Sequence, residues 1–257
     1  MPKLSIKEVV GREAKAQARK DEWRSIYEDC YEFALPQRNL YNGYYEGKVP
    51  GKGKMQRVFD STAMSSTKRF ANRLQSGLFP PNRKWCRLEP GVAVPRQDRE
   101  RAQKILDAYI DIMFDQLRQT SFDLAMGEFL LDLCVGTAVM MVTPGDEVTP
   151  VRFLAIPQYL VAIEEGANGT IDNVYRKMRV KAEAISREFP DIVITPDLAD
   201  RIERKPGDEL DLFDAVIFDQ ETGRYHYHVI WPEKSQELVY REMQSSPFIV
   251  ARFSKTA

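Results

Sequence analysis

The stretch FDAVIFDQETGRYHYHVIW, residues 213–231, carries the clearest fold signal in the chain. Two runs rich in β-branched and aromatic residues, 213–219 and 224–231, stand on either side of the turn QETG. Runs of this composition around a short turn that contains glycine are typical of a β-hairpin. We therefore expect antiparallel sheet in this part of the chain.

Other stretches on both sides of the hairpin also have the composition of strands. Each is a short apolar run that contains β-branched residues or alternates apolar with polar positions. We expect further strands at 137–142, 151–156, 159–165 and 171–180, and a last strand pair near 236–253. Two short helices are expected near 182–189 and 196–204, within this strand-rich part.

The first half of the chain has the periodicity of helices instead. Apolar residues recur every three to four positions in four segments, which is the spacing of one helix face. We expect helices at 5–34, 60–78, 98–119 and 120–135. Ser5 and Glu8 have the spacing of a capping box at the start of the first helix. Trp85, in the turn-rich connection after the second helix, is expected to fill a gap in the core.

Apolar side chains mark one face of two of these helices. In the first helix they are Trp23, Ile26, Tyr27, Cys30 and Ala34. Core or subunit packing is the expected use of that stripe. In the helix at 98–119 they are Ala102, Ile105, Leu106, Tyr109, Ile112, Met113 and Leu117.

The order of these elements predicts the α+β fold class. A helix-rich N-terminal part is followed by a mostly antiparallel sheet with small helices. We place the division between the helical part and the β-rich part at residues 143 and 144, so that the two parts are 1–143 and 144–257. We find no internal repeat and no low-complexity tract in the sequence.

The composition is that of a soluble globular protein. Of the 257 residues, 43% are hydrophobic and 29% are charged, which excludes a disordered chain, collagen and a coiled-coil rod. The three cysteines are widely spaced and predict no disulfide framework. The longest apolar stretch, Leu133–Val142, is too short to span a bilayer, and the charged N-terminus has no secretion signal. We expect no membrane partner.

Charge is divided unevenly along the chain. Residues 1–90 carry 18 basic and 10 acidic side chains, whereas residues 91–257 carry 19 basic and 28 acidic side chains. Such a division indicates a polyanionic partner for the first part, or a basic face of one subunit that meets an acidic face of another. Neutralisation of the two parts by each other within the fold is the alternative.

Most of the candidate contact residues lie in a basic loop and in the helix that follows it. The loop, residues 36–58, mixes lysine and arginine with tyrosine, a composition that suits phosphate contact and base stacking. In the helix at 60–78, Arg69 and Arg73 lie one turn apart outside the apolar stripe, which indicates an external anion. The residues predicted to contact DNA or a neighbouring subunit are Arg38, Lys48, Lys52, Lys54, Arg57, Lys68, Arg69, Arg73, Arg83 and Lys84.

Candidate catalytic or metal-binding groups are few. His226 and His228 are two apart in an expected strand, so their imidazoles share one face, which is either solvated or part of a metal site. Asp107, Asp111 and Asp115 share one helix face, which is either solvated or able to bind a divalent metal. The loop 36–58 lacks the spacing of a P-loop, and other catalytic motifs are absent. We therefore predict no catalytic, metal-binding or cofactor-binding residues.

Four stretches, taken in order, resemble one protein family. They are WRSIYEDCYEFALPQRNLY (23–41), VFDSTAMSSTKRFANRLQSGLFPPNRKW (58–85), SFDLAMGEFLLDLCVGTAVMMV (121–142) and VRFLAIPQYLVAIEEGANGTIDNVYRK (151–177). The chain resembles the portal, or head-to-tail connecting, proteins of short-tailed bacteriophages. The second stretch is the most specific of the four, and none of them is a catalytic signature.

The resemblance implies a structural subunit and not an enzyme. Such proteins form rings of about twelve subunits at one vertex of the capsid, and double-stranded DNA passes through the central hole during packaging and ejection. The implied partners are other copies of the chain, the terminase, capsid or scaffold proteins and the tail adaptor. The implied location is the virion, after assembly in the cytoplasm of the bacterial host.

The part of the portal fold that the resemblance implies is the wing, a mixed layer of helices and strands. The stem, clip and crown regions of portals are expected to be absent from this chain. Two other functions stay open: a metal-dependent nucleic-acid-processing enzyme, which would use the aspartates at 107, 111 and 115, and a protein adaptor that forms no ring.

Overall fold

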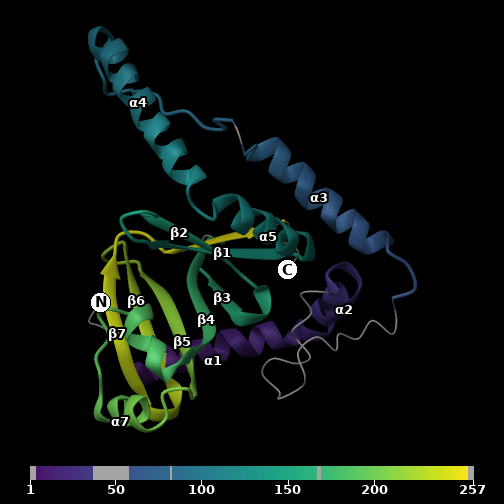
Figure 1. The fold of residues 1–257 in the computed structure, drawn as a ribbon, viewed down its shortest axis with the longest axis vertical. Coiled ribbons are helices and arrows are strands. Elements are labelled where there is room, and N and C mark those ends of the chain that lie inside the picture. Colours follow the sequence, from purple (N-terminus) through teal and green to yellow (C-terminus); the bar gives the residue numbers. More distant parts are fainter. Residues whose placement is uncertain (1–3, 37–57, 82, 167–168, 254–257) are drawn as a thin grey trace. The chain divides into compact units, whose positions relative to one another are not determined.

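The computed structural model describes residues 4–36, 58–81, 83–166 and 169–253, and Figure 1 shows its helices and strands along the chain. The fold is mixed α+β, which confirms the predicted class. Helices dominate the N-terminal half, and antiparallel sheets dominate the C-terminal part.

The chain divides into two compact units, each built from two separate segments. Residues 1–29 and 157–248 form the first, which we call the five-stranded unit. Residues 30–156 and 249–257 form the second, which we call the three-stranded unit. The division that the sequence suggested at residues 143 and 144 separates helix-rich from strand-rich sequence, and as a domain boundary it stays a prediction.

An antiparallel sheet is the frame of the five-stranded unit. Its strands are β3 (Val161–Glu165), β4 (Ile171–Lys181), β5 (Glu209–Asp219), β6 (Arg224–Trp231) and β7 (Gln236–Met243). They are neighbours in chain order, and each neighbouring pair is antiparallel. The hairpin predicted at 213–231 is confirmed as β5 and β6. Gly223 in its turn has a φ of 67°, a left-handed conformation that glycine adopts readily because it has no Cβ.

Helix α1 (Ile6–Glu22) packs against the five-stranded sheet. Its Val9 and Ala16 are buried in an apolar core that they share with residues of β3 to β6. The predicted capping box is confirmed at its start. The Ser5 N–H donates to Glu8 Oε2 at 2.9 Å, and the Glu8 N–H donates to Ser5 Oγ at 3.3 Å.

The single helix predicted at 5–34 is wrong, because the structure has two helices there. The Trp23 N–H bonds to the Lys20 carbonyl at 3.0 Å and closes α1 with a tight last turn. Helix α2 (Arg24–Ala34) then begins. Trp23 is 43% exposed and Ile26 is 52% exposed, so the predicted aromatic stripe is not buried along its whole length. Its helical spacing was compatible with one continuous helix and did not reveal the break.

Small helices connect β4 to β5. They are η4 (Ala182–Ala184), α6 (Ile185–Glu188) and α7 (Pro196–Arg204), and they confirm the helices predicted near 182–189 and 196–204. The Leu198 N–H donates to the Thr195 hydroxyl at 3.4 Å, which caps α7. Two further turns of 3-10 helix, η3 (Gln158–Leu160) and η5 (Pro232–Lys234), precede β3 and β7.

The ammonium of Lys20 on α1 is held in a partly buried place. It donates to the carbonyl of Tyr159, and burial together with the nearby charge of Lys177 lowers the pKa of Lys20 to about 7. A lysine in the unfolded chain titrates near 10.5. The unfolded state therefore binds the Lys20 proton more strongly than the folded state does.

This difference predicts a pH effect on stability. The free energy of unfolding should rise, by up to about 1.4 kcal/mol per pH unit, from the folded pKa towards the unfolded one. That window runs from about pH 7 towards pH 10.5. In a Lys20→Met variant this rise should disappear, while other titrating groups act equally on both proteins. Urea unfolding of the two proteins at pH 6, 8 and 10 measures the difference, and parallel pH curves would contradict it.

A smaller antiparallel sheet is the frame of the three-stranded unit. Its order is β2-β1-β8, with β1 (Thr137–Pro144), β2 (Val151–Ile156) and β8 (Phe248–Arg252). The strands predicted at 137–142 and 151–156 are confirmed. The two strands predicted near 236–253 are confirmed as β7 and β8, but they do not complete one sheet, because β7 belongs to the five-stranded sheet and β8 joins the sheet of β1. Pairing between segments more than 100 residues apart leaves no local mark in the sequence.

Two helices pack near this sheet in one apolar core. Helix α5 (Phe122–Val135) supplies most of the core residues, and α3 (Thr62–Leu78) packs along α5. The Gln75 side chain of α3 donates to the Asp123 carbonyl of α5 at 2.8 Å. Gly136, with a φ of 145°, ends α5 and leads directly into β1.

Trp85 lies in an aromatic cluster of this core, as predicted. Its ring stacks on Phe122, with centroids 5.9 Å apart, and meets Phe79 and Phe114 edge-on at 5.1 and 5.4 Å. Phe153 of β2 contacts the other side of the cluster through Phe122, at 5.1 Å. The connection between α3 and the next helix is therefore held in place by one large side chain.

The helix predicted at 98–119 is α4 (Arg99–Arg118), preceded by the short η2 (Arg96–Asp98). Only Ile110 and Phe114 of α4 are buried. Neither belongs to the apolar face read from the sequence. Of that face, Ala102, Leu106, Met113 and Leu117 are half-buried, and Ile105, Tyr109 and Ile112 are exposed.

Candidate interaction surfaces

The predicted contact residues fall into three groups. Five of them, Arg38, Lys48, Lys52, Lys54 and Arg57, lie outside the residues that the structure describes. Lys68, Arg69 and Arg73 lie on α3. Arg83 and Lys84 lie in the connection that leads from α3 to α4.

The outer face of α3 is purely basic. The helix contains no aspartate or glutamate, and Lys68, Arg69 and Arg73 are all exposed. In the described part of the chain none of these three cations forms an ion pair. Thr67 and Ala71 are buried on the opposite side of the helix. Arg69 and Arg73 are about 6 Å apart along the axis, and their repulsion is relieved when an anion binds from outside.

Lys84 differs from these three because it already has a partner within the chain. Its ammonium pairs with the Asp111 carboxylate of α4, and both side chains are about half exposed. Arg83 is exposed and forms no ion pair with another described residue. The structure therefore leaves Arg83 with the α3 cations as a candidate contact and assigns Lys84 to a contact with α4.

The three aspartates of α4 form a row compensated by cations. Arg87 lies 3.8 Å from Asp107, Lys84 pairs with Asp111, and Arg118 lies 2.8 Å from Asp115. Within the described ranges no group of three or more His, Cys, Asp or Glu side chains has the arrangement of a metal site. The row is therefore an exposed helix face on which each carboxylate lies near a cation.

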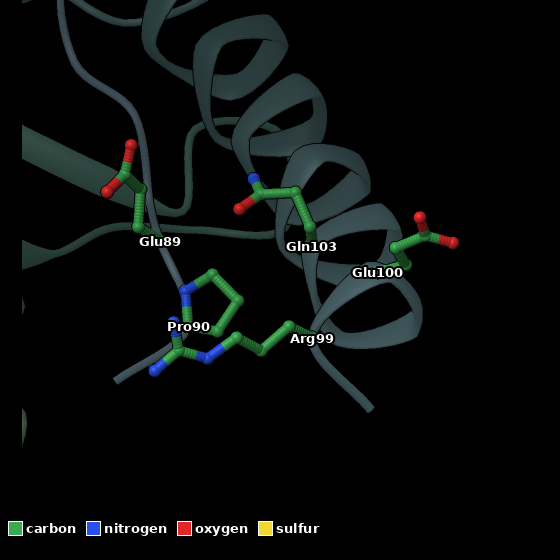
Figure 2. Close-up of a pocket in the computed structure, with 5 residues that line it drawn as sticks. All are labelled: Glu89, Pro90, Arg99, Glu100 and Gln103. Carbon is green, nitrogen blue, oxygen red and sulfur yellow. The ribbon is translucent and has the colours of Figure 1, made fainter. Parts of the chain in front are cut away.

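An open hollow lies where the chain enters α4. Figure 2 shows its five lining residues: Glu89, Pro90, Arg99, Glu100 and Gln103. It measures about 300 Å³. The Gln103 amide donates to the Leu88 carbonyl at 3.0 Å and to Asp107 at 2.7 Å. The ionisable residues among these five are two carboxylates, Glu89 and Glu100, and one guanidinium, Arg99.

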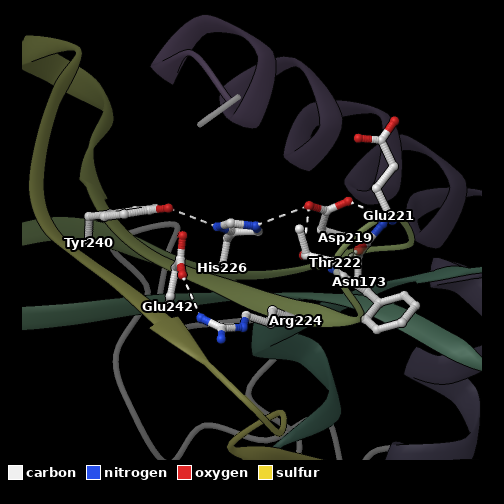
Figure 3. A network of polar contacts seen from close by, with 9 residues as sticks. Asn173, Asp219, Glu221, Thr222, Arg224, His226, Tyr240 and Glu242 are labelled. Atoms are coloured by element: carbon white, nitrogen blue, oxygen red, sulfur yellow. Dashed lines mark hydrogen bonds and ion pairs between the residues drawn. The ribbon is translucent and has the colours of Figure 1, made fainter. Parts of the chain in front are cut away.

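The histidines are buried, so the solvated face proposed for them is wrong. His226 is 8% exposed and His228 is 1% exposed, because β6 is covered on both faces from His226 to its end at Trp231. His226 Nδ1 lies 2.8 Å from the Tyr240 hydroxyl, and His228 Nδ1 lies 2.7 Å from a Glu237 oxygen. Figure 3 shows the first of these contacts.

Asp219, at the end of β5, belongs to the same polar network as His226. Its carboxylate lies 3.7 Å from His226 Nε2 and accepts the Glu221 N–H and the Thr222 hydroxyl (Figure 3). Burial alone would raise the pKa of Asp219, but these hydrogen bonds hold it well below its usual value. Asp219 and its donors thus fix the β5–β6 turn, which is a structural use of the polar residues.

The geometry thus presents exposed helix faces and no catalytic constellation among the described residues. A family model described as "Bacteriophage head to tail connecting protein" matches residues 7–257. The chain belongs to the bacteriophage head-to-tail connecting protein family. No curated protein matches the sequence.

Family membership assigns this chain a structural role in the phage virion, at the junction of head and tail. A connecting protein has partners on the head side and on the tail side, so surfaces that bind protein are its functional sites. No helix in the described part of the chain combines the length and apolar character needed to cross a bilayer.

One surface of this family member was missed from the sequence. The apolar residues of α4 cover an arc of about 200° on a helical wheel, twice the width that one packing partner needs. An apolar arc this wide in the sequence could have predicted that α4 packs against a second partner. The exposed part of it holds Ile105, Tyr109 and Ile112.

Proposed function

We propose that this chain is a portal subunit of a short-tailed phage. Copies of it assemble into a ring of about twelve at one capsid vertex, and double-stranded DNA passes through the ring during packaging and ejection. The tail attaches to the same ring. The observation that carries the proposal is the match to the connecting-protein family over residues 7–257.

The charge pattern supports assembly of identical copies. In a ring, each subunit offers one surface to one neighbour and a different surface to the other. The α3 face is basic and lacks a partner within the described chain. The segment 157–248 of the five-stranded unit carries 18 acidic and 11 basic side chains. Unlike charges on different parts of one subunit favour association between copies and set their orientation.

The same pattern suits a channel for DNA. Several fixed phosphate contacts would hold the duplex tightly and in a salt-dependent way, which would hinder its movement. A small number of exposed cations, such as Lys68 and Arg83, guides the duplex without holding it. The further partners are the terminase, capsid or scaffold proteins and a tail adaptor, and the location is the portal vertex of the virion.

Light scattering at low and high salt, with negative-stain images of the same sample, tests the ring. The expected mass is about twelve times the 29.6 kDa of one chain. A smaller mass at high salt is expected if charge drives the contact, because salt screens exposed charges. A protein that stays monomeric at all concentrations, and still binds capsid protein, would favour the adaptor without a ring.

Reversal of the α3 charges should disrupt assembly. In an Arg69→Glu, Arg73→Glu variant we expect at least about a tenfold loss of ring and of packaged DNA, because like charges would then face the anionic partner. Quantitative sedimentation and a DNA-packaging assay measure the two effects. Lys15→Glu with Arg19→Glu on α1 is the matched control, since these exposed cations have the same spacing. Unchanged assembly and packaging in the α3 variant would contradict the assignment.

A further inference from the structure

Helix α4 keeps an apolar stripe at the surface after the chain has folded. Ile105, Tyr109 and Ile112 are 50%, 61% and 59% exposed. They follow one another at intervals of four and three residues, so they lie on one face and extend over about 10 Å of the helix. Three large apolar side chains in a row are more than scattered surface residues, and such a row marks an interaction site.

The stripe is distinct from the edge of α4 that packs inside its own unit. Ile110 and Phe114 are buried, and Phe114 meets the ring of Trp85 at 5.4 Å. On the helical wheel these two residues lie about 100–140° from Tyr109. The helix therefore has a partner within the chain on one side and an uncovered stripe on another. Apolar residues at intervals of three and four form a row on one helix face, and a second helix packs along such a row.

Two carboxylates lie on one side of the stripe. Asp111 and Asp115 are one turn apart, about 6 Å along the axis of α4, and on the helical wheel they lie about 100° and 60° from Ile112. Each is exposed and pairs only with an exposed cation, Lys84 or Arg118. Exposed pairs of this kind are weak and exchange readily with another cation.

The outer face of α3 has the complementary character. Arg69 and Arg73 are also one turn apart, and neither forms an ion pair in the described part of the chain. The inner face of α3 packs on α5 of its own chain, so the arginines lie on the face left for a partner. Arginine suits an apolar stripe with carboxylates beside it, because its methylene stem covers apolar surface while its guanidinium pairs with a carboxylate.

We propose that the α4 stripe receives α3 of a second copy of this chain. Arg69 and Arg73 of that copy face Asp111 and Asp115, and their stems cover Ile112, the stripe residue nearest to these aspartates on the helix. The inference rests on the proposed ring, in which one copy meets the next through two different surfaces. It assigns the α3 arginines to a neighbouring subunit and not to the DNA path.

Polar replacement of the stripe tests the apolar part of this contact. Ile105→Gln with Ile112→Gln, in the full chain, should weaken self-association at least about tenfold in sedimentation velocity, because the stripe would no longer gain from burial. Val148→Gln is the control, since Val148 is 76% exposed outside the stripe. Circular dichroism shows whether each variant is folded. A folded stripe variant that assembles as the wild type does would overturn the proposal.

A charge exchange tests the partner. Asp111→Arg with Asp115→Arg should disrupt assembly, as should Arg69→Asp with Arg73→Asp. All four changes in one chain should restore it, because the two surfaces are again complementary. If the wild type forms rings but the fourfold variant does not assemble, the α3–α4 contact is overturned while the proposed ring stands. A wild-type chain that stays monomeric would overturn the ring and this contact together.

Discussion

An Asp214→Ala variant is expected to lose about 3–5 kcal/mol of the free energy of unfolding of the five-stranded unit. Asp214 on β5 is completely buried and lies opposite Arg176 of β4. Its two oxygens accept from Arg176 Nε at 3.1 Å and from an Arg176 Nη at 2.6 Å. Removal of the carboxylate leaves the Arg176 guanidinium in the sheet interior without the group that pairs with it.

A third side chain adds to this cost. The Tyr227 hydroxyl donates to Asp214 at 3.1 Å. Burial and the adjacent Asp214 carboxylate raise the pKa of Tyr227 well above its usual value, so the hydroxyl stays a donor at ordinary pH. Alanine at position 214 would leave this buried donor without its acceptor, which places the expected loss towards the upper end of the range of about 3–5 kcal/mol.

Urea unfolding followed by circular dichroism measures the effect. Asp211→Ala is the matched control on the same strand, because Asp211 is exposed and pairs with Arg179 at 2.6 Å. The Asp211→Ala change should lower the free energy of unfolding by less than about 1 kcal/mol. An Arg176→Met, Asp214→Leu double variant should be more stable than Asp214→Ala, since no buried charge remains. Equal effects of Asp214→Ala and Asp211→Ala would contradict this account.

Truncation of Phe122 should have a comparable effect on the three-stranded unit. Phe122→Ala is expected to cost about 3–5 kcal/mol, the range for a large aromatic side chain removed from a core. Phe122 is buried and contacts three other rings: Phe79 at 6.2 Å, Trp85 at 5.9 Å and Phe153 at 5.1 Å. Its loss leaves a cavity between α5, β2 and the connection that carries Trp85.

Hydrogen exchange of α5 and β1 measures this effect within the unit that holds the cluster. Leu124→Ala is the control, because Leu124 lies on the same helix and is 70% exposed. We expect faster exchange in the Phe122 variant and little change in the control. Slow, wild-type exchange in Phe122→Ala would show that the cluster repacks around the cavity.

These two interior networks leave the connecting function to the surface. The buried Arg176–Asp214 pair stabilises the five-stranded unit, and the aromatic cluster stabilises the three-stranded unit. Neither network uses a residue of the α3 and α4 outer faces. Arg69, Arg73 and the stripe of α4 can therefore be varied with little effect on the fold. For a protein of the head-to-tail connecting family, this separation lets assembly be tested apart from stability.

Local features of the fold were predictable because their causes are local. The 213–231 hairpin follows from two strand-like runs around a glycine-containing turn, and the capping box follows from Ser5 and Glu8. The basic outer face of α3 also follows from spacing alone, since a helix that buries Thr67 and Ala71 must expose Arg69 and Arg73. Family membership was accessible from the order of four stretches in the chain.

Tertiary structure decided what depends on partners distant in sequence. Strand β8 joins β1 across more than 100 residues, and the imidazoles of His226 and His228 are buried because β6 is covered on both of its faces from His226 onward. Periodicity identified an apolar face on α4, but the two residues that tertiary packing buries, Ile110 and Phe114, lie beside that face, and its Ile105, Tyr109 and Ile112 stay exposed. A residue pattern specifies the faces of an element, whereas the elements packed against it determine which face is covered.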